Sequence, residues 1–354
     1  MTTINSSAPV LVTGAAGYIA SWLVKDLLEA GHTVHGTVRD PHKKKGLEHL
    51  HKLAAAHPDK LKLFAADLLT SGSFDIAMQG CELVMHTASP FVISGIKDAY
   101  EDLVRPAVEG TRNVLESANR CASVKRVVLT SSEAAIYGDN IDAKDAPNHT
   151  LDESNWNTSS SLEHQPYPYS KVSAEKEAWA IQKKQSRWDL VTINPGLVLG
   201  PSLTRASAST SLVFIKQLTN GTMFPAAPDL PMGVADVRDV AQAHFKAGFT
   251  PQAQGRHAIS AGDSTPLEMG RLLRKRFGGK YKFPLFQAPK LMVWLAAPMA
   301  GLTRKYVELN VGHPLHFDSS KSRRELKLKY RPLEQTLADH FNQLLDDGLI
   351  RRRG

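Results

Sequence analysis

A tyrosine and a lysine four residues apart form the pair with the clearest chemistry in this sequence. Tyr167 and Lys171 begin a segment, from about residue 168 to 184, that we expect to be helical, and this spacing places both side chains on one helix face. A free phenol has a pKa of about 10, too high for efficient proton exchange at neutral pH, but a neighbouring ammonium stabilises the phenolate. Only this one of the eight tyrosines has a lysine four positions later. The pair therefore predicts a general acid, against the alternative of a solvent-facing tyrosine beside an unrelated lysine.

Two serines follow the apolar run 126–130, which we expect to be a strand. At the end of such a strand, the hydroxyl of Ser131 or Ser132 could hold a carbonyl oxygen beside the phenol of Tyr167. Side chains alternate along a strand, so only one of the two serines can face the substrate. We assign the role to Ser132 and keep Ser131 as the competing assignment. A serine that bonds only the backbone is the alternative for both.

Residues 10–40 have the pattern of a strand, a tight turn, a helix and a second strand. The apolar run 10–12 leads to Gly14, which permits the sharp turn, and Gly17 lets backbone N–H groups approach a pyrophosphate at the positive end of the helix. A second apolar run, 33–38, completes the βαβ unit that this glycine spacing requires. The stretch predicts a dinucleotide site rather than an ordinary glycine-rich turn.

The residues after the second strand indicate which dinucleotide is bound. A carboxylate at this position suits the ribose 2′-hydroxyl of NAD, whereas an arginine suits the 2′-phosphate of NADP. Arg39 together with Lys43 forms a plausible phosphate clamp and favours NADP(H). Asp40 is the alternative, either as the acidic residue shifted by one position or as a cap for the next helix.

The elements that must position these residues alternate between strand and helix. Further strands are expected at 61–65, 83–86 and 190–193, and a long amphipathic helix at about 98–121. This alternation predicts an α/β fold, a Rossmann-type doubly wound parallel sheet, in which ligands bind beyond the carboxyl ends of the strands. We place the cofactor-binding domain with the catalytic residues at 1–200. The remainder, 201–354, is expected to form a smaller, mixed C-terminal substrate lobe, some of whose segments return to the core.

Within that lobe, helices are expected at about 209–218, 267–277, 290–302 and 333–347. The apolar stretch 291–302 is too short to span a bilayer and contains Pro298, so it predicts a buried helix. The polar, Asn- and Ser-rich stretch 140–165 predicts a long and functional loop.

The bulk composition limits the classes of partner. The net charge of +8 is spread along the chain without an aromatic platform for nucleic acid, which favours a small anionic ligand over nucleic acid or a membrane. Two cysteines and a start without an export leader predict a cytoplasmic protein. We expect no metal site, and a monomer or homodimer.

Several motifs occur in the order seen in extended short-chain dehydrogenases/reductases. The chain resembles most closely their dihydroflavonol-reductase, cinnamoyl-CoA-reductase and fungal carbonyl-reductase branch. The motifs lie at 14–23, 37–41, 87–90, 130–132, 152–156, 167 with 170–171, and 194–195. The resemblance implies NADPH as the cofactor and Ser132, Tyr167 and Lys171 as the catalytic trio. It also implies that further residues line the cofactor: Gly14, Ala16, Gly17, Tyr18, Ile19, Asp67, Leu68, Thr87, Ala88, Ser89, Thr130, Pro195, Val198 and, as a weaker assignment, Ser211.

These observations predict an NADPH-dependent reductase of aldehydes or ketones, with Tyr167 as the proton donor. One alternative is a nucleotide-sugar epimerase or dehydratase that retains NAD, because Ile136-Tyr137-Gly138 after the serines is more typical of that branch. Another alternative is a cofactor-sensing protein that does not catalyse a reaction. The Tyr/Lys pair argues against this alternative.

The substrate pocket is expected to be apolar and partly aromatic. Phe91 and Val92 follow the strand end at 87–90, and Ile136 and Tyr137 follow Ser132. Such a pocket suits aromatic or medium-chain aldehydes, whereas a nucleotide sugar needs many polar partners. Two arginines are the counter-indication, since either could bind a diphosphate: Arg205 and Arg238.

Overall fold

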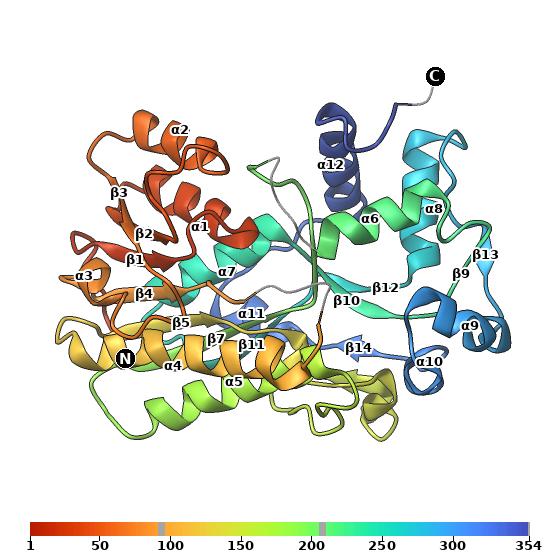
Figure 1. The fold of residues 1–354 in the computed structure, drawn as a ribbon, viewed down its shortest axis with the longest axis horizontal. Coiled ribbons are helices and arrows are strands. Elements are labelled where there is room, and N and C mark those ends of the chain that lie inside the picture. The colour runs from red at the N-terminus through yellow and green to blue at the C-terminus, as the bar shows by residue number, and fades with distance from the viewer. Residues whose placement is uncertain (91–95, 205–209, 353–354) are drawn as a thin grey trace.

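Seven parallel strands form the central sheet of the protein (Figure 1). The computed structural model describes residues 1–90, 96–204 and 210–352. In spatial order the strands are β3 (Leu61–Ala65), β2 (Val34–Val38), β1 (Val10–Thr13), β4 (Leu83–His86), β5 (Arg126–Thr130), β7 (Asp189–Pro195) and β11 (Gly255–Ile259). The strand order reverses between β1 and β4, where a doubly wound sheet opens its ligand crevice. The predicted fold class is confirmed.

Both faces of this sheet are buried, as the period of two along each strand requires. In β1, Val10 and Val12 belong to one hydrophobic core and Leu11 to a second core on the opposite face. Helices α1 and α7 pack together over the first face, and α4 and α5 over the second (Figure 1). Around the sheet lie α1 (Tyr18–Glu29), α2 (Glu48–Ala56), α3 (Asp75–Met78), α4 (Arg105–Arg120), α5 (Pro166–Gln182), α7 (Val237–Phe249) and α11 (Ser320–Glu325).

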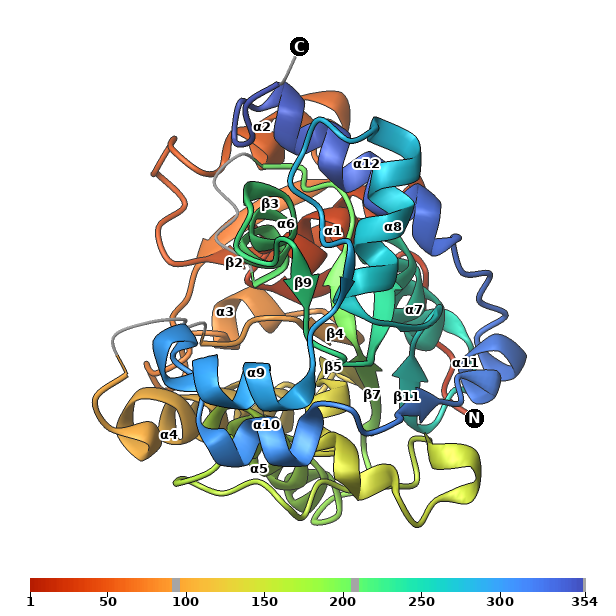
Figure 2. The same ribbon diagram turned by 90° about the vertical axis from the view of Figure 1, so that its right-hand side faces the viewer.

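A second layer of smaller elements lies beyond the carboxyl edge of the sheet (Figure 2). Its strands are β8 (Leu197–Leu199), β10 (Met232–Asp236) and β12 (Gly262–Ser264) in one sheet, and the pairs β9 (Ala226–Ala227) with β13 (Phe286–Gln287) and β6 (Thr150–Leu151) with β14 (His316–Phe317). Its helices are α6 (Thr210–Asn220), α8 (Pro266–Phe277), α9 (Lys290–Ala296), α10 (Arg304–Asn310) and α12 (Leu333–Asp346). Because α7, β11 and α11 return to the main sheet, segments after residue 200 contribute to both layers.

Some elements differ from their predicted bounds. The helix expected at 98–121 begins with a π-helical turn, η1 (Tyr100–Val104), before α4. The loop expected at 140–165 contains two 3₁₀ turns, η3 (Asn140–Ala143) and η4 (Pro147–His149), and then β6.

The expectation of a buried helix at 291–302 is wrong. It forms α9 and a 3₁₀ turn, η5 (Ala297–Ala300), at the outer end of the smaller layer, where Leu291 is 68% and Met299 is 93% exposed. Val293 and Trp294 of α9 pack against a small cluster that includes Val307 of α10. One side of α9 therefore faces inward. None of the helices in the described residues is long and apolar enough to cross a membrane.

Candidate active site

The first turn of the βαβ unit allows the protein backbone to come close to a ligand. Gly14 has φ of +65°, and a Cβ there would lie 3.1 Å from two atoms of Ala88 on the neighbouring strand end. Both the conformation and the space therefore require glycine. Helix α1 then begins at the cap residue Gly17 without a side-chain cap and without an acid in its first turn. Its free N–H groups and positive dipole are available to an anion.

Buried hydroxyl and imidazole groups fix the ends of the strands beside this turn. The Thr13 hydroxyl oxygen accepts the backbone N–H groups of Thr87 (3.1 Å) and Ala88 (3.0 Å), and it lies 2.9 Å from Nδ1 of His86. Burial, with the charge of Lys171 as a second cause, lowers the pKa of His86 to about 3, so the ring is neutral. These bonds hold the 87–88 segment against the glycine turn.

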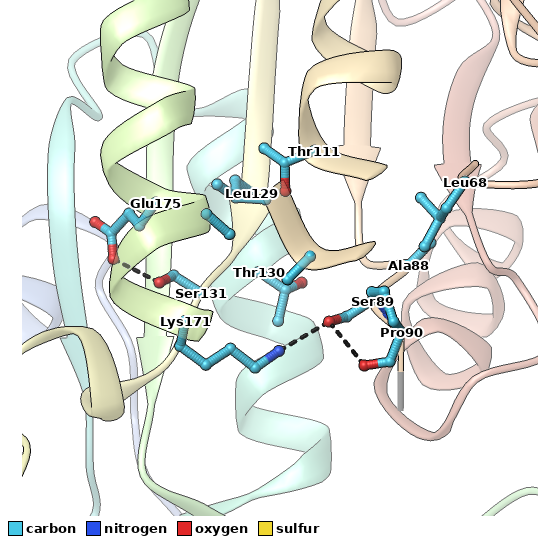
Figure 3. Close-up of a pocket in the computed structure, with 12 residues that line it drawn as sticks. Leu68, Ala88, Ser89, Pro90, Thr111, Leu129, Thr130, Ser131, Lys171 and Glu175 are labelled. Atoms are coloured by element: carbon cyan, nitrogen blue, oxygen red, sulfur yellow. Dashed lines mark hydrogen bonds between the residues drawn. The ribbon is translucent and has the colours of Figure 1, made fainter. Parts of the chain in front are cut away.

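Tyr167 and Lys171 lie in the first turns of α5, as predicted. The Lys171 Nζ lies 5.4 Å from the centroid of the Tyr167 ring and donates a hydrogen bond to Ser89 Oγ at 2.8 Å (Figure 3). Tyr167 is 42% exposed. The ammonium is therefore held between the phenol and the end of β4, while the phenol itself is open to a ligand.

The two serines have different surroundings. Ser131 Oγ donates to the buried Glu175 Oε2 at 2.5 Å, which turns this hydroxyl away from a substrate (Figure 3). Ser132 Oγ accepts the N–H of Ala134 at 3.1 Å, and its own proton has no acceptor among the described residues. The geometry favours Ser132 as the residue that holds a substrate oxygen.

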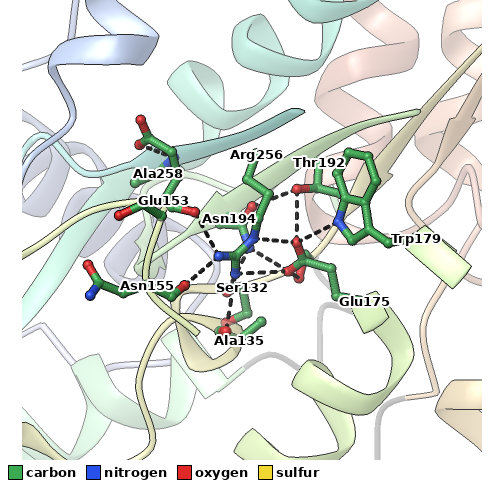
Figure 4. Close-up of polar contacts among 12 residues, drawn as sticks. Ser132, Ala135, Glu153, Asn155, Glu175, Trp179, Thr192, Asn194, Arg256 and Ala258 are labelled. Carbon is green, nitrogen blue, oxygen red and sulfur yellow. Dashed lines mark hydrogen bonds and ion pairs between the residues drawn. The ribbon is translucent and has the colours of Figure 1, made fainter. Parts of the chain in front are cut away.

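A buried ionic cluster lies next to Ser132 (Figure 4). Glu175 of α5 accepts hydrogen bonds from Arg256 Nε at 2.7 Å and from Asn194 Nδ2 at 2.7 Å. Asn194 also donates to the backbone oxygen of Ser132 at 3.1 Å. The sequence analysis did not identify this cluster, although Glu175 lies one turn after Lys171 in the middle of α5 and so close to the predicted pair on the helix.

A cleft of about 710 Å³ brings most of the predicted residues together. That volume lies in the range of sites for small molecules and cofactors, about 300 to 1,000 Å³. The predicted residues that line it are Ala16, Gly17, Tyr18, Ile19, Thr87, Ser89, Thr130, Ser132, Tyr137, Tyr167, Lys171, Pro195, Val198 and Ser211. Ser131 also lines it, and Leu68 and Ala88 line a small cavity of about 20 Å³ beside it (Figure 3).

Other predicted residues lie elsewhere. Arg39, Lys43 and Asp67 are exposed and do not line this cleft. Ile136 does not line this cleft and is only 1% exposed, which corrects its assignment to a substrate pocket. The 3₁₀ turn η2 (Glu133–Ala135) redirects the chain after Ser132, so the Ile136 side chain joins a hydrophobic core. Phe91, Val92 and Arg205 lie outside the described residues.

Arg238 and Asp40, the two charged residues considered for alternative ligands, have partners within the chain. Arg238 forms ion pairs with Asp236 (2.7 Å) and Asp339 (2.8 Å), which leaves it poorly placed to clamp a diphosphate. The Oδ1 atom of Asp40 accepts the N–H of His42 at 2.9 Å. This contact lies within the turn after β2, and Asp40 does not cap the next helix, because α2 begins at Glu48 with Leu47 as its cap residue.

A glycine turn at the switch point of a doubly wound sheet, with a Ser/Tyr/Lys trio at the same edge, defines an extended short-chain dehydrogenase/reductase. Comparison with known families agrees with this class. The chain belongs to the NAD dependent epimerase/dehydratase family, whose model matches residues 10–262.

Individual relatives are reductases by name. A cinnamoyl-CoA reductase of Medicago truncatula is 38% identical over 347 residues, which cover 97% of this chain and 98% of the relative. The structure of Gre2 from Candida albicans in complex with NADPH has a TM-score of 0.78 and 30% identity, and the match covers 96% of this chain and 99% of that one. Yeast methylglyoxal/isovaleraldehyde reductase Gre2, complexed with NADPH, also has a TM-score of 0.78, with 29% identity and coverage of 97% and 100%. The predicted family branch is confirmed.

Proposed function

We propose that this protein reduces an aldehyde or ketone to an alcohol with NADPH. The observation that carries the proposal is the convergence of Ser132, Tyr167 and Lys171 with the start of α1 in a single cleft. The reductases among its relatives and the NADPH complexes among its structural neighbours support it.

The residues present fit a dinucleotide. The turn at Gly14 and the uncapped N-terminus of α1 would hold the pyrophosphate, and the cations after β2, Arg39 and Lys43, would take the 2′-phosphate. Pro195 at the end of β7 and Val198 in β8, which line the cleft, would border the nicotinamide. When bound, NADPH supplies the hydride that reaches the carbonyl carbon.

The side chains of the trio account for the movement of the proton. The free hydroxyl proton of Ser132 would hold the carbonyl oxygen, and the phenol of Tyr167 would donate a proton to that oxygen as negative charge develops on it. Lys171 would stabilise the resulting phenolate and bind the nicotinamide ribose. The hydrogen bond from Lys171 to Ser89 restricts its ammonium to the required place beside the ring.

A panel of aldehydes and ketones assayed with NADPH and with NADH tests the proposal. We expect NADPH to be consumed with aromatic or medium-chain aldehydes, and UDP- and GDP-sugars to be left unchanged. The family also contains epimerases and dehydratases by its description. Conversion of a nucleotide sugar without added cofactor, together with inert aldehydes, would replace the proposed reductase by such an enzyme.

Replacing Arg39 by alanine is expected to remove most of the preference for NADPH over NADH. A charge-assisted hydrogen bond to phosphate contributes about 1.5 to 3 kcal/mol, so the ratio of kcat/KM values should fall at least about tenfold. The steady-state constants for both cofactors measure this change. Lys52→Ala, which removes an exposed lysine of α2, is the control and should leave the ratio unchanged. If the wild-type protein uses both cofactors equally well, the site belongs to Asp40 and NAD.

A further inference from the structure

The residue after Ser132 is a buried acid with an unused oxygen. Glu133 begins the turn η2, lines the cleft and is only 3% exposed. Its Oε1 atom has no hydrogen-bond partner in the described part of the chain. Buried polar atoms without partners are rare in folded proteins, because an unpaired atom costs free energy. We therefore expect a ligand group to pair with this oxygen.

A glycine on β10 leaves the space that this carboxyl occupies. A Cβ built on Gly233 would lie 2.6 Å from Glu133 Oε1, and its three nearest atoms all belong to that carboxyl. Gly233 does not have a positive φ. Glycine is therefore needed here to leave room for the carboxyl, and not to allow an unusual backbone conformation. A Cβ on Gly196, at the end of β7, would lie 2.7 Å from Glu133 Oε2. Both glycines line the cleft, so the carboxyl lies against its wall.

The surroundings of Glu133 favour its neutral form. Burial, and then the negative charge of Asp263, raise the pKa of the Glu133 carboxyl well above its usual range. Asp263 pairs with Gly233 between strands β12 and β10, and its Oδ1 atom also lacks a partner among the described residues. A neutral carboxylic acid both donates and accepts a hydrogen bond, whereas a carboxylate only accepts.

Two tyrosines line the same cleft as Glu133. Burial raises the pKa of Tyr137 well above its usual range, with the charges of Glu133 and then Tyr306 as further causes, and burial raises the pKa of Tyr306 to about 12. Both phenols are therefore neutral. The sequence predicted an apolar approach to the reacting carbonyl, but the described wall next to Ser132 carries a carboxylic acid and phenols.

We propose that Glu133, supported by Tyr137, forms a subsite for a neutral hydroxyl group of the substrate, so that hydroxylated carbonyl compounds are preferred over plain and over carboxylated ones. A hydroxyl both donates and accepts, which matches the neutral acid. A carboxylate in this place would lie against the Glu133 carboxyl, which has no cationic partner among the described residues. The proposal rests on the proposed function, because it names the class of carbonyl compound that the same cleft takes.

Three aryl ketones with one skeleton test it: acetophenone, 2-hydroxyacetophenone and benzoylformate. The wild-type protein is expected to prefer the hydroxylated ketone, by kcat/KM with NADPH. In Glu133→Leu the preference for 2-hydroxyacetophenone over acetophenone should fall about tenfold, the effect of losing one good hydrogen bond. Glu133→Gln, which keeps a donor and an acceptor, should retain most of the preference. The comparison between variants removes the intrinsic difference in reactivity between the ketones.

Equilibrium binding separates this inference from the proposed function. If no ketone or aldehyde is reduced, but calorimetry still shows tighter binding of 2-hydroxyacetophenone to the wild-type protein than to Glu133→Leu, the subsite stands and the reductase activity fails. If the leucine variant reduces and binds the three ketones in wild-type proportions, the subsite is wrong. Should Glu133→Leu not fold, Gly233→Ala serves instead, because its Cβ must displace the carboxyl and should reduce the same preference.

Discussion

Tyr167→Phe is expected to lower kcat by about 10²-fold or more, the usual effect of removing a general acid. The phenylalanine ring keeps the place of the phenol at the start of α5, 5.4 Å from the Lys171 ammonium in the native arrangement, but it has no proton to give. Binding of NADPH should persist, because the start of α1 and the cations after β2 are untouched. Steady-state kinetics with an accepted aldehyde measure the first effect, and calorimetric titration with NADPH measures the second.

Tyr169→Phe is the matched control for this change. It removes a phenol from the same turn of α5, but Tyr169 does not line the cleft and has no lysine four residues later. Activity within about twofold of wild type is expected, as for most changes that lose no specific contact. If Tyr169→Phe abolishes turnover while Tyr167→Phe remains active, the assignment of the proton donor is wrong.

The strands could be predicted closely because each leaves a local signal. β3, β4 and β5 have the predicted bounds. β4 and β5 are buried on both faces and so are short, mostly apolar runs, whereas β3 is only partly buried at the edge of the sheet. The glycine turn was also readable, because Gly14 requires a positive φ that few other residues adopt. Tyr167 and Lys171 were found because their spacing fits one helix face. These features depend on neighbours within a few residues.

The features that were missed or left open depend on contacts between distant segments. Ser131 and Ser132 are equivalent in sequence, and what distinguishes them is Glu175, 44 residues after the first serine. Ile136 was expected in the pocket because the 3₁₀ turn before it gives no clear signal in sequence. The apolar stretch of α9 was expected to be buried because of its apolar composition. That composition does not indicate that α9 lies at the outer end of the smaller layer.

The largest effect on stability is expected from Arg256→Met, which leaves Glu175 buried without its cation. Arg256 Nε lies 2.7 Å from Glu175 Oε1, and the two side chains are 7% and 0% exposed. The guanidinium also donates to the backbone oxygens of Glu153 (2.7 Å) and Ala135 (3.1 Å), so it joins β11 to the loop before α5 and to the turn after Ser132 (Figure 4). Removal of one partner of a buried pair costs about 3 to 5 kcal/mol, because the remaining charge stays desolvated.

The matched control is Arg112→Met on α4, whose partner Glu177 lies on the same helix as Glu175. That pair is nearly as short, 2.9 Å, but its side chains are 42% and 26% exposed. Solvent replaces the lost interaction there, so the free energy of unfolding should change by at most about 1 kcal/mol. Urea unfolding followed by tryptophan fluorescence measures both variants. A double variant, Glu175→Met with Arg256→Met, removes both charges and should recover part of the loss, since no unpaired charge remains. Equal destabilisation by Arg256→Met and Arg112→Met would show that burial of the Glu175 cluster does not determine its strength.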